Sequence, residues 1–286
     1  MAALLNWFED PPSLRRPVLI VALDGFVDAG IAASTASTFL RHRWQAELLA
    51  TYDRDAFLDY RARRPTAVVD SGELRRLDWP ALELHAAAVD GPHDAVLLLG
   101  AEPDMSWDSF CATTVQACRR LGVVASAGLG AYPAAVPHTR PTRIVSATNP
   151  AQGGLSVDTV PIRGYTGPVG AGTALHDALG AAGIPAVGLW AEVPHYVAGS
   201  PNPAAALALV HAIGEALGTH VDATELEAAA KLHREQVDEA VAEHSDAALM
   251  VAALERHLDS GDVDEDLPTG DDLADEIERF LRAQSD

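Results

Sequence analysis

The sequence predicts an α/β fold, in which a mixed, largely parallel sheet has flanking helices and is followed by an acidic helical extension. Three observations predict it. Short apolar runs recur along the chain, as expected of strands that are buried on both faces of a parallel sheet. Helical patterns lie between several of these runs, which favours helices layered on a sheet. The last part of the chain, positions 221–286, holds 20 acidic and 5 basic residues.

The first predicted strand is the apolar run 17–23, which is followed directly by Asp24. A helix is predicted over about 28–41, with Asp28 at its start, where the helix dipole favours a carboxylate. Further strands are predicted at 47–51, 66–70, 95–100, 123–127, 143–147 and 186–190, and further helices at 106–121 and 172–182.

The part of the chain around position 75 has a different pattern. Charged residues such as Glu73 and Arg75 alternate poorly with apolar ones, and few large apolar residues occur before Leu82. We expect an antiparallel hairpin here, formed by 67–72 and 81–89.

A strand, a tight turn and a closing helix are predicted between Ala191 and Gly218. Asn202 is a strong N-cap residue, and Pro203 suits the first turn of a helix because its missing N–H is not needed there. The helix then presents one apolar stripe to the sheet, made of Ala206, Leu209, Val210, Ile213 and Leu217.

The C-terminal part predicts an acidic α-helical extension, residues 221–286, after an α/β core domain, residues 1–220. Between positions 222 and 258, apolar residues are spaced for two amphipathic helices with a break near His244. A last short helix is predicted from Asp271 to about position 283, and its apolar face suits docking into a groove on its own body or on a partner. That face consists of Leu273, Ile277, Phe280 and Leu281.

Composition excludes several classes of function. A formal net charge of −21 argues against binding nucleic acid through its phosphate backbone, which requires a basic surface. No apolar run reaches the roughly 20 residues that span a bilayer, and the first residues do not resemble a signal peptide, so we expect no membrane partner and a cytoplasmic protein. Cys111 and Cys118 lie seven positions apart in a predicted helix, too far for an unstrained disulfide, and we expect both to be buried thiols.

Polar residues that follow the parallel strands are the first candidates for chemistry, because α/β sheets bind ligands beyond the carboxyl ends of their strands. These candidates are Asp24, Asp28, Glu102, the segment 128–132, Glu192 and His195. Three acids from this set, together with the histidine, could hold a metal or perform acid–base work. Acids in these places are also ordinary caps of the helices that follow, and this interpretation is the commoner one.

Other motifs give weaker indications. The glycines at 122–130 do not form a dinucleotide fingerprint, and those at 164–172, before Thr173, lack the Gly-Lys-Ser/Thr of a nucleotide loop. His138 and Arg140 lie on a proline-stiffened loop, where the arginine suits a carboxylate or phosphate ligand or an acidic neighbour. No His-x₃-His or His-Glu-x₂-His spacing occurs, so no metal site and no cofactor is predicted.

Three strings in order, VALDGFVDAG at 21–30, GLGAYPAAVPHTRP at 128–141 and the segment 191–218, resemble the proteasome assembly chaperone 2 family of archaea and actinobacteria. The resemblance covers about 5–218. It implies a nucleoside-phosphorylase-like α/β fold, a dimer or trimer, and a role in protein assembly with a proteasome-related partner. It supplies no catalytic residue.

Two hypotheses follow. The first is a non-catalytic, self-associating assembly or interaction protein whose acidic extension contacts a partner. The alternative is an enzyme or metabolite-binding protein for a small anionic or nucleoside-like ligand, with Asp24, Glu102, Arg140 and His195 around one pocket at the strand ends. Whether these four side chains converge on one point is the structural test that separates the two.

Overall fold

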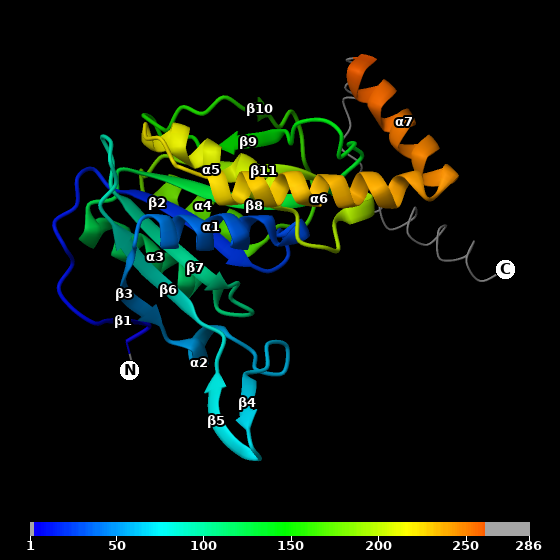
Figure 1. The fold of residues 1–286 in the computed structure, drawn as a ribbon. Coiled ribbons are helices and arrows are strands. Elements are labelled where there is room, and N and C mark those ends of the chain that lie inside the picture. Colours follow the sequence, from blue (N-terminus) through cyan, green and yellow to red (C-terminus); the bar gives the residue numbers. More distant parts are fainter. Residues whose placement is uncertain (1–2, 261–286) are drawn as a thin grey trace.

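The computed structural model describes residues 3–260 and shows a nine-stranded sheet with helices on both faces (Figure 1). The strand order is β1-β3-β6-β7-β2-β8-β11-β9-β10. These strands are β1 Leu5–Trp7, β2 Val18–Asp24, β3 Glu47–Tyr52, β6 Leu82–Ala87, β7 Ala95–Ala101, β8 Ala125–Ala134, β9 Ile144–Thr148, β10 Val160–Pro161 and β11 Ala186–Pro194. The helices are α1 Ala32–Arg43, α2 Arg54–Phe57, α3 Trp107–Leu121, α4 Ala171–Ala181, α5 Pro203–Leu217, α6 Thr224–Ala242 and α7 Ser245–Ser260, with short 3₁₀ turns η1 Ala29–Ile31 and η2 His195–Val197.

The centre of the sheet is parallel and its flanks are antiparallel. Strand β2 pairs in parallel with β7 and β8, and β8 pairs in parallel with β11. Strands β6 and β9 then pair antiparallel with β7 and β11. The predicted mixed α/β fold is therefore confirmed. The carboxyl ends of β2, β7, β8 and β11 share one edge of the sheet, which we call the strand-end edge.

Two apolar layers cover the sheet. Alternate residues of the apolar run in β2 point to opposite faces, so both faces need helices. Helices α1 and α5 pack on one face, with Leu40 and Leu209 fully buried. Helices α3 and α4 pack on the other, where Phe110 and Leu175 are fully buried.

The predicted hairpin has a different second strand. Strand β4 Thr66–Asp70 pairs with β5 Glu73–Asp78 in a two-stranded sheet of their own, which we call the hairpin (Figure 1). The prediction of 81–89 as its second strand was wrong, because β6 joins the main sheet between β3 and β7. Leu82 and Leu84 are buried there, whereas every residue of β5 is exposed.

The C-terminal helices form as predicted within the described residues. Pro203 is the first residue of α5, and the Asn202 side chain accepts a hydrogen bond from the backbone N–H of Ala205. Helices α6 and α7, which we call the arm, extend from the body after it (Figure 1). Leu226 is the only buried residue of α6 and Val251 the only one of α7. The predicted last helix, 271–283, lies outside the described residues.

Two smaller predictions concern the rest of the chain. Cys111 and Cys118 lie in α3 as free, buried thiols, and burial raises the pKa of Cys111 to about 11 and that of Cys118 to about 12. Among the described residues, no helix combines the length and the apolarity that crossing a bilayer requires.

Candidate functional site

Glu102 joins two loops at the strand-end edge. It follows β7, and its Oε1 accepts a hydrogen bond from the backbone N–H of Ala171, the first residue of α4, at 2.6 Å. Its Oε2 accepts from the N–H of Phe26, in the loop after β2, at 2.9 Å. A Cβ on Gly25 would lie 2.1 Å from Oε2, so glycine is needed there for the carboxylate to fit. This acid therefore acts as a cap that is distant in sequence, and it occupies an amide that an anionic ligand of α4 would use.

We expect Glu102→Ala to lower the free energy of unfolding by about 1–2 kcal/mol, because two backbone amides lose a charge-assisted acceptor. Thermal or urea unfolding measures it. The matched control is Asp24→Asn at the same edge. The Asp24 side chain is mostly exposed and its nearest cation, Nη1 of Arg63, is 3.7 Å away, so we expect a change below about 0.5 kcal/mol. Equal effects of the two variants would contradict the bridging role.

Asp28 caps the first helix, as the commoner interpretation of these acids predicts. Its Oδ1 accepts from the N–H of Ala33 at 2.7 Å, and its Oδ2 accepts from the N–H and the hydroxyl of Ser34. Burial raises the pKa of Asp28 above its ordinary value. The carboxylate is thus fully engaged by the start of α1.

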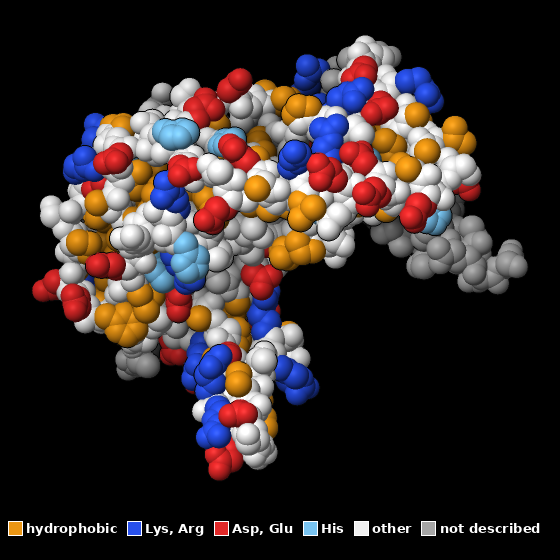
Figure 2. Space-filling view, in the orientation of Figure 1, with side chains coloured by type: hydrophobic (Ala, Val, Ile, Leu, Met, Phe, Trp, Pro, Cys, Tyr) orange, Lys and Arg blue, Asp and Glu red, His pale blue; other side chains and the backbone are white. Residues whose placement is uncertain are grey.

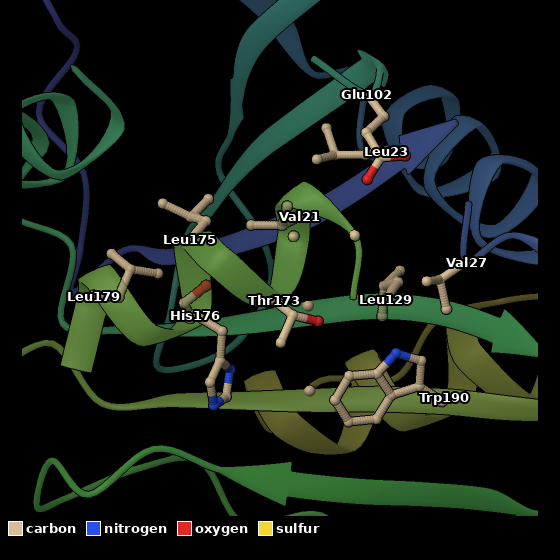
Figure 3. A pocket seen from close by; sticks show the side chains of 15 residues that line it. Val21, Leu23, Val27, Glu102, Leu129, Thr173, Leu175, His176, Leu179 and Trp190 are labelled. Carbon is tan, nitrogen blue, oxygen red and sulfur yellow. The ribbon is translucent and has the colours of Figure 1, made fainter. Parts of the chain in front are cut away.

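A small pocket lies between α4 and the strands β2, β8 and β11 (Figure 3). Figure 3 shows Glu102 beside Leu23 at one side of the pocket, with Thr173, His176 and Trp190 around the rest. Burial lowers the pKa of His176, which favours the neutral imidazole. The pocket has a volume of about 50 Å³, which suits a few waters or a small ligand.

The indole ring of Trp190 packs against glycines of the sheet. A Cβ on Gly188 would lie 2.2 Å from an atom of its indole ring, and one on Gly130 would lie 2.5 Å from another. These glycines let the ring lie against the strands, which explains the repeated glycines that the sequence shows in β8 and β11.

His138 and Arg140 contact the arm instead of the strand-end edge. Both lie on the loop between β8 and β9, residues 135–143, which we call the docking loop. The Nδ1 of His138 is 2.7 Å from the hydroxyl of Tyr196, and its Nε2 is 3.0 Å from Asp238 of α6. Arg140 forms ion pairs with Glu255 at 3.1 Å and Asp259 at 2.7 Å, both on α7. The arginine therefore serves acidic neighbours, one of the two alternatives that its sequence context left open.

His195 and Glu192 both lie at the end of β11 but have different surroundings. Nδ1 of His195 is 3.3 Å from the carbonyl oxygen of Ala134, and the ring lies edge-on to Tyr196. Glu192 is only 3% exposed, and Arg143 holds it with two hydrogen bonds of 2.6 and 2.8 Å.

The hydroxyl of Tyr132 donates a third hydrogen bond to Glu192, at 2.9 Å. Burial and the negative charge of Glu192 raise the pKa of Tyr132. The pairing of Glu192 with Tyr132 and Arg143 could not be predicted from the sequence, because Tyr132 reaches it from β8 and Arg143 from the end of the docking loop. A buried acid held by an arginine is a structural ion pair, and here both carboxylate oxygens accept hydrogen bonds.

The structure thus places the four candidate residues in two groups. Asp24 and Glu102 lie at the ends of β2 and β7, while Arg140 pairs with the last turns of α7 and His195 packs against Tyr196 after β11. Among residues 3–260, no hydrogen bond or ion pair joins one group to the other. No group of three or more His, Cys, Asp or Glu side chains within that range is arranged to hold a metal ion.

The nine-stranded sheet with helices on both faces defines a class of α/β protein, and solved structures share this fold. The chain resembles a Corynebacterium glutamicum protein of unknown function, with a TM-score of 0.84 and 32% identity over 91% of this chain and 98% of that one. It resembles the Mycobacterium tuberculosis proteasome-assembly chaperone homologue, with a TM-score of 0.73 and 36% identity over 82% of this chain and 99% of that one.

A Pyrococcus furiosus protein described as an archaeal proteasome activator shares the fold, with a TM-score of 0.63 and 17% identity over 82% of this chain and 97% of that one. No curated protein matches this chain. The model of the PAC2 family matches residues 22–241. The chain therefore belongs to the PAC2 family, which confirms the resemblance seen in the sequence.

Proposed function

We propose that this protein is a non-catalytic, self-associating assembly protein that acts in the cytoplasm on a proteasome-related partner. The observation that carries the proposal is the apolar surface of the strand-end edge. Three loops expose large apolar side chains there: Phe26, which is 66% exposed, Met105 and Val169. Exposed apolar side chains on neighbouring loops are typical of a protein-binding surface.

The polar residues of the same edge support this proposal. Both oxygens of Glu102 accept hydrogen bonds from backbone amides, and Asp28 caps a helix. Both carboxylates therefore fix the positions of the loops. The loop after β2 also holds Ile31 at a φ of 45°, a left-handed conformation that is costly for a β-branched residue, and the Ile31 side chain is exposed. A strained, apolar and rigidly capped loop suits the presentation of a contact surface to another protein.

The relatives supply the class of partner. The Mycobacterium tuberculosis protein with 36% identity is described as a proteasome-assembly chaperone homologue, and family membership makes the same role the best hypothesis for this chain. The arm is a second candidate contact for the partner, because it projects from the body and carries more acids than bases.

The test is affinity purification of the tagged full-length chain from its native cell, with mass spectrometry of the proteins recovered. We expect proteasome or chaperone subunits in a fixed ratio, and their loss from the variant Phe26→Asp/Val169→Asp. Leu48→Asp, on the exposed surface of β3, is the control and should recover the same partners. Recovery of no such subunit with the unmodified chain would contradict the proposal.

The pocket supports a second candidate, a binding site for a small ligand. Ser126 lines it and is 2% exposed. A serine hydroxyl can both donate and accept a hydrogen bond, so one that lines a pocket can bind a polar group of a ligand or a water molecule. Adding inorganic phosphate or adenosine should then raise the melting temperature of the chain but not that of Ser126→Ala. If neither probe raises the melting temperature, the hypothesis of a small anionic or nucleoside-like ligand is excluded.

A further inference from the structure

Helix α7 is held to the body by charged contacts with the docking loop. Nε and Nη2 of Arg140 donate to the two carboxylate oxygens of Asp259 at 3.0 and 2.7 Å, and its Nη1 donates to Glu255 at 3.1 Å. The hydroxyl of Thr139 also donates to Glu255. Figure 2 shows acidic and basic side chains lying together along the arm and where it meets the body. Every nitrogen of the Arg140 guanidinium therefore donates to an acid of α7.

The two acids have a spacing that suits one guanidinium. Glu255 and Asp259 are four positions apart in α7, so their side chains lie one turn apart on the same face of the helix. A guanidinium presents its donors in a planar fork, and it can therefore bridge two such carboxylates. A helix that carries two acids at this spacing thus fits the docking loop.

Apolar contacts contribute little to the position of α7. Val251 is the one buried residue among the 16 residues of this helix, and Leu249 is 70% exposed. The side chains of Arg140 and Asp259 are 34% and 55% exposed, and ion pairs in contact with solvent are individually weak. The free energy that holds α7 on the loop is therefore small, so another helix with the same charges can compete with it.

The docking loop is held in shape by contacts that do not involve α7. The backbone N–H of His138 donates to the hydroxyl of Tyr196 at 2.8 Å, and this hydroxyl lies 2.7 Å from Nδ1 of the same histidine. Because the hydroxyl accepts from the N–H, it donates to Nδ1, and the proton of the neutral imidazole lies on Nε2, 3.0 Å from Asp238 of α6. Pro137 and Pro141 restrict the backbone on either side. The loop is therefore preorganised without α7.

Helix α6 has its own contacts with the body, so α7 can leave the loop by itself. Arg234 of α6 donates to the carbonyl oxygen of Thr139 at 3.2 Å, and Leu226 is buried in the core. Only residues 243–244 link α6 to α7. The match to the PAC2 family model ends at position 241, before α7. The helix that fills the docking loop is thus an addition to the matched part of the chain.

We propose that the docking loop is a binding site for a partner helix with two carboxylates one turn apart, and that α7 masks this site until such a helix displaces it. In the masked state, Glu255 and Asp259 take the places of the partner's carboxylates. The short link keeps α7 at a high effective concentration beside the loop, so displacement requires a partner that a further contact also holds nearby. The proposal goes beyond the proposed function, which places a partner on the apolar side chains of the strand-end edge.

The experiment measures the fluorescence anisotropy of a labelled peptide with the sequence of residues 245–260, added to full-length chains. The open variant, Val251→Ser/Glu255→Gln/Asp259→Asn, lacks the buried contact and both charges of α7 but keeps the docking loop. We expect the peptide to bind the open variant at least about tenfold more tightly than the unmodified chain, because α7 no longer competes. A melting temperature equal to that of the unmodified chain will show that the open variant is folded.

Two matched controls test the chemistry of the site. Adding Arg140→Gln to the open variant should abolish peptide binding, whereas adding Arg64→Gln removes the same charge from an exposed position in another loop and should leave binding unchanged. An alanine-rich helical peptide with a Glu and an Asp four positions apart should also bind the open variant. The same peptide with these acids two positions apart presents them on different faces and should not bind.

Several outcomes overturn the proposal. Equal binding of the peptide to the unmodified chain and to the open variant would show that α7 masks nothing, and no binding to the open variant would show that the loop does not receive an acidic helix. If light scattering shows an oligomeric unmodified chain and a monomeric open variant, α7 occupies the loop of a second copy instead. These readouts need no proteasome-related subunit, so failure of this proposal and failure of the proposed function are distinguishable.

Discussion

Gly100→Ala is expected to lower the free energy of unfolding by at least about 3 kcal/mol, and to reduce the yield of folded protein. Gly100 lies in β7 between β2 and β6, with a φ of 118°, a conformation that L-residues rarely adopt. A Cβ there would lie 2.1 Å from the carbonyl oxygen of Ala81. That oxygen accepts a hydrogen bond from Ala101 at 2.8 Å, so the two backbones cannot separate without breaking the ladder.

Gly128→Ala is the matched control for this prediction. It lies in β8, which is separated from β7 by β2, its φ is not in the left-handed region, and the nearest atom to an added Cβ is 4.0 Å away. We expect a change within about 1 kcal/mol, because alanine fits and restricts the unfolded chain. Urea unfolding of both variants measures the difference. A Gly100→Ala variant as stable as Gly128→Ala would show that β6 and β7 can move apart.

The central strands and the helices could be predicted from the sequence, because their signals are local. The apolar run of β2 and the helix start at Asn202 and Pro203 each carry enough information within a few residues. The pairing of the hairpin could not be predicted from the sequence, because the choice of partner for β4 depends on whether β6 is required in the main sheet. Burial of Leu82 and Leu84 decides that, and burial is a property of the whole fold.

The sequence predicted the positions of the site residues along the chain but not the groups that they contact. The strand-end rule placed Glu102 at the carboxyl edge, but its two amide partners, at Phe26 and Ala171, are distant in sequence. The alternatives left open for Arg140 were resolved by two acids of α7 that are more than 100 positions away. Contacts of this kind depend on topology, so residue type and spacing suggested the chemistry of the group but not its partner.

Removal of the Arg143 guanidinium, which pairs with Glu192, is expected to have the second large effect on the free energy of unfolding. Glu192 is almost fully buried, and its hydrogen bonds raise the pKa of Arg143 above its ordinary value. Arg143→Met keeps much of the aliphatic stem and removes both hydrogen bonds. Within residues 3–260, the buried carboxylate then keeps Tyr132 as its one side-chain donor. We expect a loss of about 3 kcal/mol, measured by urea unfolding at pH 7.

The double variant Arg143→Met/Glu192→Met is the control, because it removes the buried charge together with its partner. Buried ion pairs are often replaceable by apolar pairs at little cost, so we expect it to recover most of the stability. A double variant as unstable as the single one would mean that packing, and not the unpaired charge, causes the loss.

The Arg143 variant should also loosen the arm, because Arg143 anchors the docking loop. The backbone N–H of Glu192 donates to the carbonyl of Arg143 at 3.0 Å, so side chain and backbone together fix the end of this loop against β11. Arg140, three residues earlier, holds α7 through Glu255 and Asp259. Hydrogen exchange of α7 amides should therefore be faster in Arg143→Met than in the unmodified chain. Exchange as slow as in the unmodified chain would show that the arm is held independently of this ion pair.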